Sequence, residues 1–369
     1  MIYNDLGDSG VRTSAIGFGA MRWPSEEAAA AILERGMDLG MNYVDTSTGY
    51  CGGQSEPWTA RAVRDRRADI YFSDKSNWAA APDAGAVRRS IDKSLETTGL
   101  DDLDFYQLWG LQEMDVLTAA LKKGGFVEGV RKARDEGLIR HGLGFTFHGT
   151  PEVFRAAVDS GEFVCATVSY NLMNRKEEEN IAYAAARGVG VIIMNPLAGG
   201  VLGMAGSDAL SFLRAGELGP AAGALRFLLA HPGVTTALVG FTDVSEVNAA
   251  VAALDGAADL DEAFRRSLIE RMDAVKLPEG DFCTGCGYCK DCPNGFNPTR
   301  FMQAMRDFAL YGVAEGRLDH WLRSKYPHAD IARELAKCTE CGRCAEKCPQ
   351  HLDIVAEIRR AKAALGVTD

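Results

Sequence analysis

The 369-residue chain lacks the features that mark several classes of protein. Its opening, MIYNDLGDSG, has neither the basic stretch nor the apolar stretch of a secretory signal peptide. No apolar run approaches the roughly 20 residues that a membrane-spanning helix needs. Positive charge is also in deficit, because the formal net charge is -11. Nucleic acids and anionic membranes would repel such a surface. We therefore expect a cytoplasmic protein with no nucleic-acid partner and no membrane partner.

Hydrophobic patterning predicts an α/β fold. After a short opening hairpin, MIYNDL and VRTSA across GDSG, brief runs that are apolar on both faces alternate with longer amphipathic stretches such as Ser25 to Leu39. Strands buried inside a parallel sheet show this pattern. Eight runs are expected as strands: 16–20, 43–46, 70–74, 103–108, 142–145, 164–169, 189–194 and 235–239. Eight β/α units predict a (β/α)8 TIM barrel.

A doubly wound open sheet is the alternative for this pattern. That fold normally binds its dinucleotide through a GxGxxG motif after the first strand. The corresponding turn here reads GFGAMRWP and lacks the motif, so the barrel remains the prediction. A boundary is expected near Lys276 to Gly280, where KLPEG interrupts a helix-like run. We assign residues 1–277 to the barrel and 278–369 to a small C-terminal domain with helical stretches TRFMQAMRDFALYG and DHWLRSKY.

Eight of the ten cysteines lie in two runs in this second domain, CTGCGYCKDCP and CTECGRCAEKCP. In two-cluster ferredoxins with this spacing, three cysteines of a run bind one [4Fe-4S] cluster and the fourth, beside proline, usually binds the other. The pairing predicts one cluster on Cys283, Cys286, Cys289 and Cys348, and a second on Cys338, Cys341, Cys344 and Cys292. Structural zinc and disulfides are the alternatives. Free thiolates also require a reducing compartment, which agrees with a cytoplasmic location.

Candidate reactive residues follow the predicted strands, because TIM barrels carry their chemistry at the C-terminal strand ends. These positions hold Asp45, Tyr50, Lys75 and Trp109. Each alone is as easily a surface residue, but together on three consecutive units they predict a site. The strings VDTSTGYCGGQSE, DK and FYQLWG resemble the aldo-keto reductase family in residue type and order. LGDSGVRTSAIGFGAMRWP, VIIMNPLAGGVL and ALRFLLAHPGVTTALVGF extend the resemblance, which is to the subgroup with a C-terminal ferredoxin domain.

The resemblance implies an NAD(P)(H)-linked oxidoreductase. By this resemblance Tyr50 is the acid/base, Lys75 tunes the phenol and Asp45 orients the lysine. A phenol titrates near ~10 in water, and a buried ammonium beside it favours the phenolate. The family's histidine position holds Trp109, which offers one N–H donor and no titratable group. The expected substrates are therefore a small carbonyl compound, an alcohol or an enone.

The same resemblance places nicotinamide-cofactor contacts at the strand ends, with departures from the family pattern. The candidate contact residues are Gly19, Ala20, Met21, Thr146, Thr167, Met194 and Gly240. Phe147 and Thr167 replace the usual amide-bearing side chains. After the last strand, GFTDVSEVNAA offers backbone amides for a phosphate but no lysine or arginine for a ribose 2'-phosphate, so NAD is at least as favoured as NADP.

Three hypotheses follow for the whole chain. The first is hydride exchange in the barrel, with the clusters relaying electrons to a redox partner protein or serving in docking. No flavin motif that would couple two-electron and one-electron transfer is visible. The second is an electron-transfer or partner-binding protein with an altered barrel site. The third is a redox-neutral lyase or epimerase that uses Tyr50 and Lys75 for proton transfer.

Overall fold

The computed structural model describes residues 1–203, 208–214, 218–256, 260–275, 283–310, 314–326 and 330–367. The boundary predicted at Lys276 to Gly280 lies outside these residues. Contacts between Cα atoms divide the chain into two compact units. The first unit runs to Met272, and the second begins at Asp273 and also takes in Ala198–Val201. No helix in the described part of the chain combines the length and the apolar character that crossing a membrane requires.

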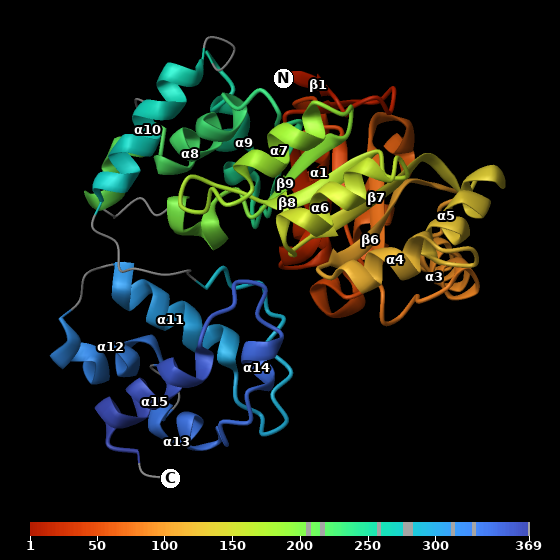
Figure 1. Cartoon of the computed structure of the whole chain (residues 1–369). Coiled ribbons are helices and arrows are strands. Elements are labelled where there is room, and N and C mark those ends of the chain that lie inside the picture. Colours follow the sequence, from red (N-terminus) through yellow and green to blue (C-terminus); the bar gives the residue numbers. More distant parts are fainter. Residues whose placement is uncertain are drawn as a thin grey trace. The chain divides into compact units, whose positions relative to one another are not determined.

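The first unit is a closed barrel of eight strands, each parallel to its neighbours, in the order β10-β3-β4-β5-β6-β7-β8-β9 (Figure 1). The strands are β3 Ile16–Gly19, β4 Tyr43–Asp45, β5 Tyr71–Asn77, β6 Leu103–Leu111, β7 Ile139–Phe147, β8 Cys165–Ser169, β9 Gly190–Met194 and β10 Thr236–Val239. All eight predicted strands and the TIM-barrel fold are confirmed. β7 begins at Ile139, earlier than predicted, because the polar residues Arg140 and His141, which pair with Asp104, break the apolar run on which the prediction rested.

A hairpin precedes the barrel, as predicted, and its connection packs against the N-terminal ends of the barrel strands. β1 (Tyr3–Asp5) pairs antiparallel with β2 (Arg12–Ser14). Gly7 in the turn has φ +53°, and a Cβ there would lie 2.1 Å from the Gly188 carbonyl oxygen, so only glycine fits. A buried apolar cluster joins the turn to the barrel interior and comprises Leu6, Val11, Tyr43, Phe105, Cys165, Ile192 and Leu238. The C-terminal ends of the strands lie at the opposite end of the barrel and carry the candidate active site.

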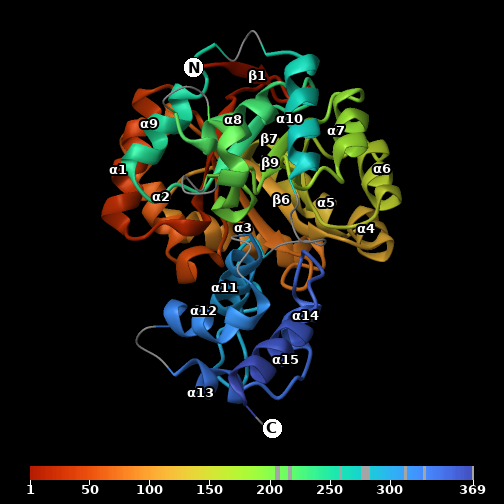
Figure 2. The same cartoon turned by 90° about the vertical axis from the view of Figure 1, so that its left-hand side faces the viewer.

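Helices form an outer layer around the strands (Figure 2). They are α1 Glu26–Asp38, α2 Ser55–Val63, α3 Ala84–Thr98, α4 Met114–Leu121, α5 Phe126–Asp135, α6 Pro151–Asp159, α7 Glu178–Ala185, α8 Pro220–Leu229, α9 Val244–Ala252 and α10 Glu262–Ala274. α1 shows how sequence sets the boundaries. The Ser25 hydroxyl accepts the Ala28 N–H at 3.2 Å, which caps the helix, and Ile32, Leu33 and Met37 bury one stripe.

The secondary-structure elements that the structure describes from Cys283 onward are all helices. The α-helices are α11 Pro298–Leu310, α12 Leu318–Lys325, α13 Ile331–Ala336, α14 Arg343–Glu346 and α15 Ile354–Leu365. α11 and α12 correspond to the two stretches predicted as helical. They pack with α13 and α15 around Phe301, Phe308, Leu322, Leu335 and Ile358, each at most 3% exposed. Seven of the eight cysteines lie in loops before or between these helices, and Cys344 lies in α14.

Candidate active site and cluster ligands

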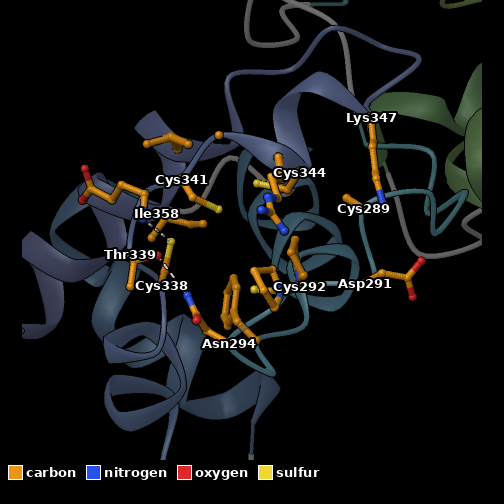
Figure 3. A pocket seen from close by; sticks show the side chains of 17 residues that line it. Cys289, Asp291, Cys292, Asn294, Cys338, Thr339, Cys341, Cys344, Lys347 and Ile358 are labelled. Carbon is orange, nitrogen blue, oxygen red and sulfur yellow. Dashed lines mark hydrogen bonds between the residues drawn. The ribbon is translucent and has the colours of Figure 1, made fainter.

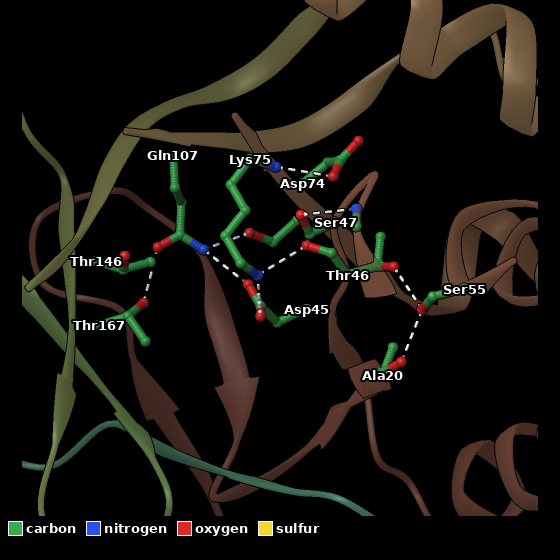
Figure 4. Close-up of polar contacts among 12 residues, drawn as sticks. Ala20, Asp45, Thr46, Ser47, Ser55, Asp74, Lys75, Gln107, Thr146 and Thr167 are labelled. Atoms are coloured by element: carbon green, nitrogen blue, oxygen red, sulfur yellow. Dashed lines mark hydrogen bonds and ion pairs between the residues drawn. The ribbon is translucent and has the colours of Figure 1, made fainter. Parts of the chain in front are cut away.

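Side chains on alternate positions of neighbouring strands form a polar layer inside the barrel (Figure 4). Tyr43, Phe105 and Cys165 face inward from β4, β6 and β8 in the apolar layer below. Two residues further along the same strands come Asp45, Gln107 and Thr167, and β5 adds Lys75. These four side chains belong to residues at most 5% exposed. The polar layer therefore follows from strand register.

Asp45 and Lys75 form a buried ion pair in this layer. The Lys75 Nζ contacts Asp45 Oδ2 and also donates to the Thr46 carbonyl oxygen at 2.7 Å. Burial raises the pKa of the Asp45 carboxyl, while the Lys75 ammonium and the Gln107 amide oppose that rise. A buried charge is tolerated when it is paired and hydrogen-bonded in this way.

Tyr50 and Trp109 lie next to that pair. The Lys75 Nζ is 4.6 Å from the centroid of the Tyr50 ring. The Tyr50 and Trp109 rings meet edge to face, with centroids 5.8 Å apart and planes at 80°. Tyr50 begins the short 3-10 segment η2 (Tyr50–Gly53), in which Cys51 has a left-handed φ of +51°. The structure thus brings together all four residues predicted from the strand ends.

Gln107 belongs to the same layer and was not predicted. Its Nε2 donates to Asp45 Oδ1 and to Ser73 Oγ, both at 2.8 Å, and its Oε1 accepts from Thr167 Oγ1 at 2.8 Å. The signal in the sequence was its position two residues before Trp109, which puts both on the inward face of β6. A single glutamine in a strand that also carries Asp104 gave no indication of its partners.

The predicted cofactor contacts lie at the strand ends, and some of them already make hydrogen bonds within the chain. Gly19 ends β3, Met194 ends β9, and Ala20 and Met21 lie in the following 3-10 segment η1 (Ala20–Arg22). The Ala20 carbonyl oxygen accepts from Ser55 Oγ at 2.7 Å, and Thr146 Oγ1 accepts the Gly110 N–H at 2.7 Å. Gly240 follows β10, the neighbour of β3.

Two departures from the family pattern have clear structural counterparts. Phe147 is 2% exposed and packs on Phe154 of α6, with ring centroids 5.0 Å apart, so it belongs to the core between strand and helix.

At the start of α9, Asp243 Oδ1 accepts the N–H groups of Ser245 at 2.7 Å and of Glu246 at 3.3 Å. The Glu246 carboxylate accepts the Thr242 N–H at 2.6 Å. Carboxylates of the chain therefore accept three of the N–H groups in the segment predicted to bind a phosphate, those of Thr242, Ser245 and Glu246.

The eight C-terminal cysteines line two cavities as free thiols. A cavity of about 310 Å³ is lined by Cys283, Cys286, Cys289 and Cys348. A cavity of about 420 Å³ is lined by Cys292, Cys338, Cys341 and Cys344, with Cys289 at its edge (Figure 3). The two sets are those expected from the spacing of the sequence. Eight thiols in two groups of four suit the ligand set of two iron-sulfur cubanes.

The two cysteine runs are held in matching ways. In the first run the Gly285 N–H donates to Cys283 Sγ at 3.4 Å, and Arg306 of α11 donates to the Cys283 carbonyl oxygen at 3.1 Å. In the second, the Glu340 N–H donates to Cys338 Sγ at 3.4 Å, and Lys362 of α15 donates to the Cys338 carbonyl oxygen at 3.2 Å. Each first cysteine therefore has a cationic side chain on its backbone and an amide on its sulfur.

Comparisons with known proteins agree with both regions. The Aldo/keto reductase family model matches residues 15–264, and the 4Fe-4S dicluster domain model matches residues 279–352. An uncharacterized oxidoreductase of Bacillus subtilis, YqkF, is 27% identical over 208 residues, which cover 53% of this chain and just under two thirds, 65%, of that protein. L-galactose dehydrogenase of Arabidopsis thaliana is 28% identical over 284 residues, covering 68% of this chain and 86% of that protein.

A solved structure shares the barrel as well. Aldo-keto reductase AKR11C1 from Bacillus halodurans, in its holo form, superposes with a TM-score of 0.64 at 25% identity and covers 76% of this chain and 98% of its own. The match to the 4Fe-4S dicluster domain favours iron-sulfur clusters over structural zinc and over disulfides for these cysteines. The chain belongs to the aldo/keto reductase family and is an oxidoreductase of that family with a C-terminal 4Fe-4S dicluster domain.

Proposed function

We propose that the barrel exchanges hydride between NAD(P)(H) and a small carbonyl compound, an alcohol or a conjugated alkene, with Tyr50 as the acid/base. The observation that carries this proposal is the Lys75 ammonium, which is buried, paired with Asp45 and 4.6 Å from the centroid of the Tyr50 ring. We also propose that residues 1–277 and 278–369 act as separate domains for hydride and single-electron chemistry.

Each side chain has a distinct part in this reaction. Tyr50 gives its hydroxyl proton to the substrate as the hydride arrives, and takes it back in the reverse direction. Lys75 stabilises the phenolate that remains. Asp45 neutralises and holds Lys75. Trp109 packs on Tyr50 where the family has histidine, so it shapes the pocket and offers at most one hydrogen bond. A bound nicotinamide would supply or accept the hydride.

In the C-terminal domain the two cysteine sets would hold the two [4Fe-4S] clusters, which carry single electrons. Cys341, in the 420 Å³ cavity, is the exposed member of the eight ligands. Exposure of a ligand brings a cluster near the surface, where a redox partner protein can reach it. The proposed route for electrons exchanged with such a partner therefore passes through the cluster on Cys338, Cys341, Cys344 and Cys292.

The test is anaerobic turnover of the cluster-loaded protein with NADH or NADPH and a panel of carbonyls and enones. Tyr50→Phe is expected to lower kcat by about 10²- to 10⁴-fold, because it removes the proton donor without altering the ring. Tyr183→Phe is the matched control, since Tyr183 lies on α7 and donates to Asp159. Iron content should be unchanged in both. Equal turnover by wild type and Tyr50→Phe would refute the assigned role.

A second candidate is an electron-transfer or partner-binding protein whose barrel holds no nicotinamide. It is favoured by the carboxylates on the first amides of α9 and by Phe147 in the core. Anaerobic titration with NADH and NADPH separates the two candidates. Absence of binding together with fast cluster reduction by a ferredoxin would support this candidate. Product formation without net electron consumption would instead support a redox-neutral lyase or epimerase.

A further inference from the structure

We infer that Gln107 is a positioning residue of the barrel site, whose side-chain amide fixes both the Asp45 carboxylate and the hydroxyl hydrogen of Thr167. The inference rests on the proposed roles of Tyr50 and Lys75. The Gln107 side chain lies between Asp45, which pairs with Lys75, and Thr167, which is a proposed cofactor contact (Figure 4).

The Gln107 amide is fully used and fully buried. Its residue is 0% exposed, and it reaches partners on β4, β5 and β8. The two hydrogens of Nε2 go to Asp45 Oδ1 and Ser73 Oγ, and Oε1 receives the Thr167 hydroxyl. A side-chain amide has two donors and one acceptor oxygen, so each group has a partner here.

The Asp45 carboxylate decides which way the amide faces. Rotating the amide by half a turn would place Oε1 against Asp45 Oδ1, where two acceptors without a hydrogen repel in a buried site. With Nε2 on Asp45, Oε1 must face Thr167, and the Thr167 hydroxyl must donate. The Thr167 oxygen then has its lone pairs available to accept a hydrogen bond from another group. At this position Thr167 would accept a hydrogen bond, as from a carboxamide N–H, and would not donate one.

The same contact limits motion of the proton-transfer group. Asp45 has one oxygen on Gln107 and the other on Lys75, so its carboxylate plane is held from both sides. Without Gln107, Asp45 Oδ1 loses the Nε2 donor in a site where Asp45 is 5% exposed. The carboxylate can then rotate, and the Thr46 carbonyl oxygen remains as the fixed partner of Lys75 near the Tyr50 ring, so the position of Lys75 is less restricted. Small misplacements of this kind have large effects on rate, about 10²-fold for roughly 1 Å.

The experiment follows the ionisation of Tyr50 directly, in the full-length cluster-loaded protein carrying ¹³C-labelled tyrosine. The resonance missing in Tyr50→Phe identifies Tyr50, and its chemical shift is followed against pH. In Gln107→Leu we expect the Tyr50 titration to move to higher pH, with a tenfold to hundredfold loss in kcat and a smaller change in KM. Thr167→Val is the matched control, because it removes one contact to Oε1 and leaves Asp45 with its donor. Its Tyr50 titration should equal that of wild type.

Gln107→Met tests whether any effect of leucine comes from misfolding, since methionine is similar in length to glutamine and cannot donate. It should reproduce the shifted titration with an unchanged circular dichroism spectrum. An unchanged Tyr50 titration in a folded Gln107 variant would overturn the inference. The titration needs no turnover. A protein inactive on every substrate but with a Gln107-dependent Tyr50 titration would therefore contradict the proposed reaction and leave this inference in place.

Discussion

The barrel site and the cysteine-rich unit position their functional groups in opposite ways. Asp45, Lys75 and Gln107 project from strands, are at most 5% exposed and satisfy one another. Seven of the eight C-terminal cysteines are instead partly or fully accessible, and only Cys348 is buried. All of them except Cys344, which lies in α14, are in loops. The barrel site is complete through contacts within the polypeptide. The cysteines instead line two cavities.

Removing iron is the largest perturbation that this comparison predicts. Because cluster binding and ordering of the ligand loops are coupled, chelation of the full-length protein should abolish hydrogen-exchange protection in α11 and α15. The central strands β4 to β6 should keep theirs. Exchange measured by mass spectrometry on the holo and iron-depleted protein checks this. Retained protection in α15 after iron loss would show that the apolar cluster alone suffices to order the C-terminal unit.

Asp45→Ala should have the next largest effect, confined to the barrel. It leaves the Lys75 ammonium buried without its carboxylate, which costs about 3–5 kcal/mol in the free energy of unfolding. Chemical denaturation followed by tryptophan fluorescence measures it. Asp38→Ala is the control, because that carboxylate pairs with Arg66 at an exposed site and should cost at most about 1 kcal/mol. Similar losses in the two variants would contradict a preformed, interdependent barrel site.

A second buried carboxyl makes the stability of the barrel depend on pH. Burial and the neighbouring Asp74 carboxylate raise the pKa of Glu56 in α2 to about 9. The folded protein therefore holds a proton that the unfolded chain releases above its ordinary pKa. The resulting stability is fully present below about pH 4.5 and is lost as pH rises toward about 9.

Glu56→Gln should remove this dependence. Between pH 5 and 8.5 the unfolding free energy of wild type should fall, relative to the variant, by on the order of 1–3 kcal/mol. Thermal unfolding of both proteins at matched pH values measures the difference. Parallel curves for wild type and variant would show that Glu56 is ionised in the folded protein.

The smallest predicted effect distinguishes the two cysteine runs from each other. Arg306→Met and Lys362→Met each remove a cation and a hydrogen bond, worth about 1 kcal/mol. Loss of positive charge should make the reduction potential of the adjacent cluster more negative. Arg306→Met should act on the cluster of Cys283, and Lys362→Met on that of Cys338. Redox titration followed by electron paramagnetic resonance checks this, with exposed Arg323→Met of α12 as the control. A shift of both clusters by either variant would contradict separate roles.

The sequence predicted much of the fold because strand burial and helical amphipathicity are local patterns. All eight barrel strands, the opening hairpin and the amphipathic stretch that forms α1 were found in this way. Two local features were not predicted. The early start of β7 was hidden by the polar residues Arg140 and His141, and the sequence did not indicate that Asp243 accepts the Ser245 N–H or that Glu246 accepts the Thr242 N–H.

The cysteine spacing by itself predicted two sets of four cysteines, and in the structure each set lines one of two cavities. Residue order also predicted that Asp45, Tyr50, Lys75 and Trp109 lie on three consecutive barrel units. Only the tertiary structure decided what these side chains touch. Closure of the barrel put Gln107 of β6 between Asp45 and Thr167, residues 62 and 60 positions away in the chain. Hydrogen bonds across a barrel depend on register and on amide orientation, and neither is encoded in the neighbouring residues.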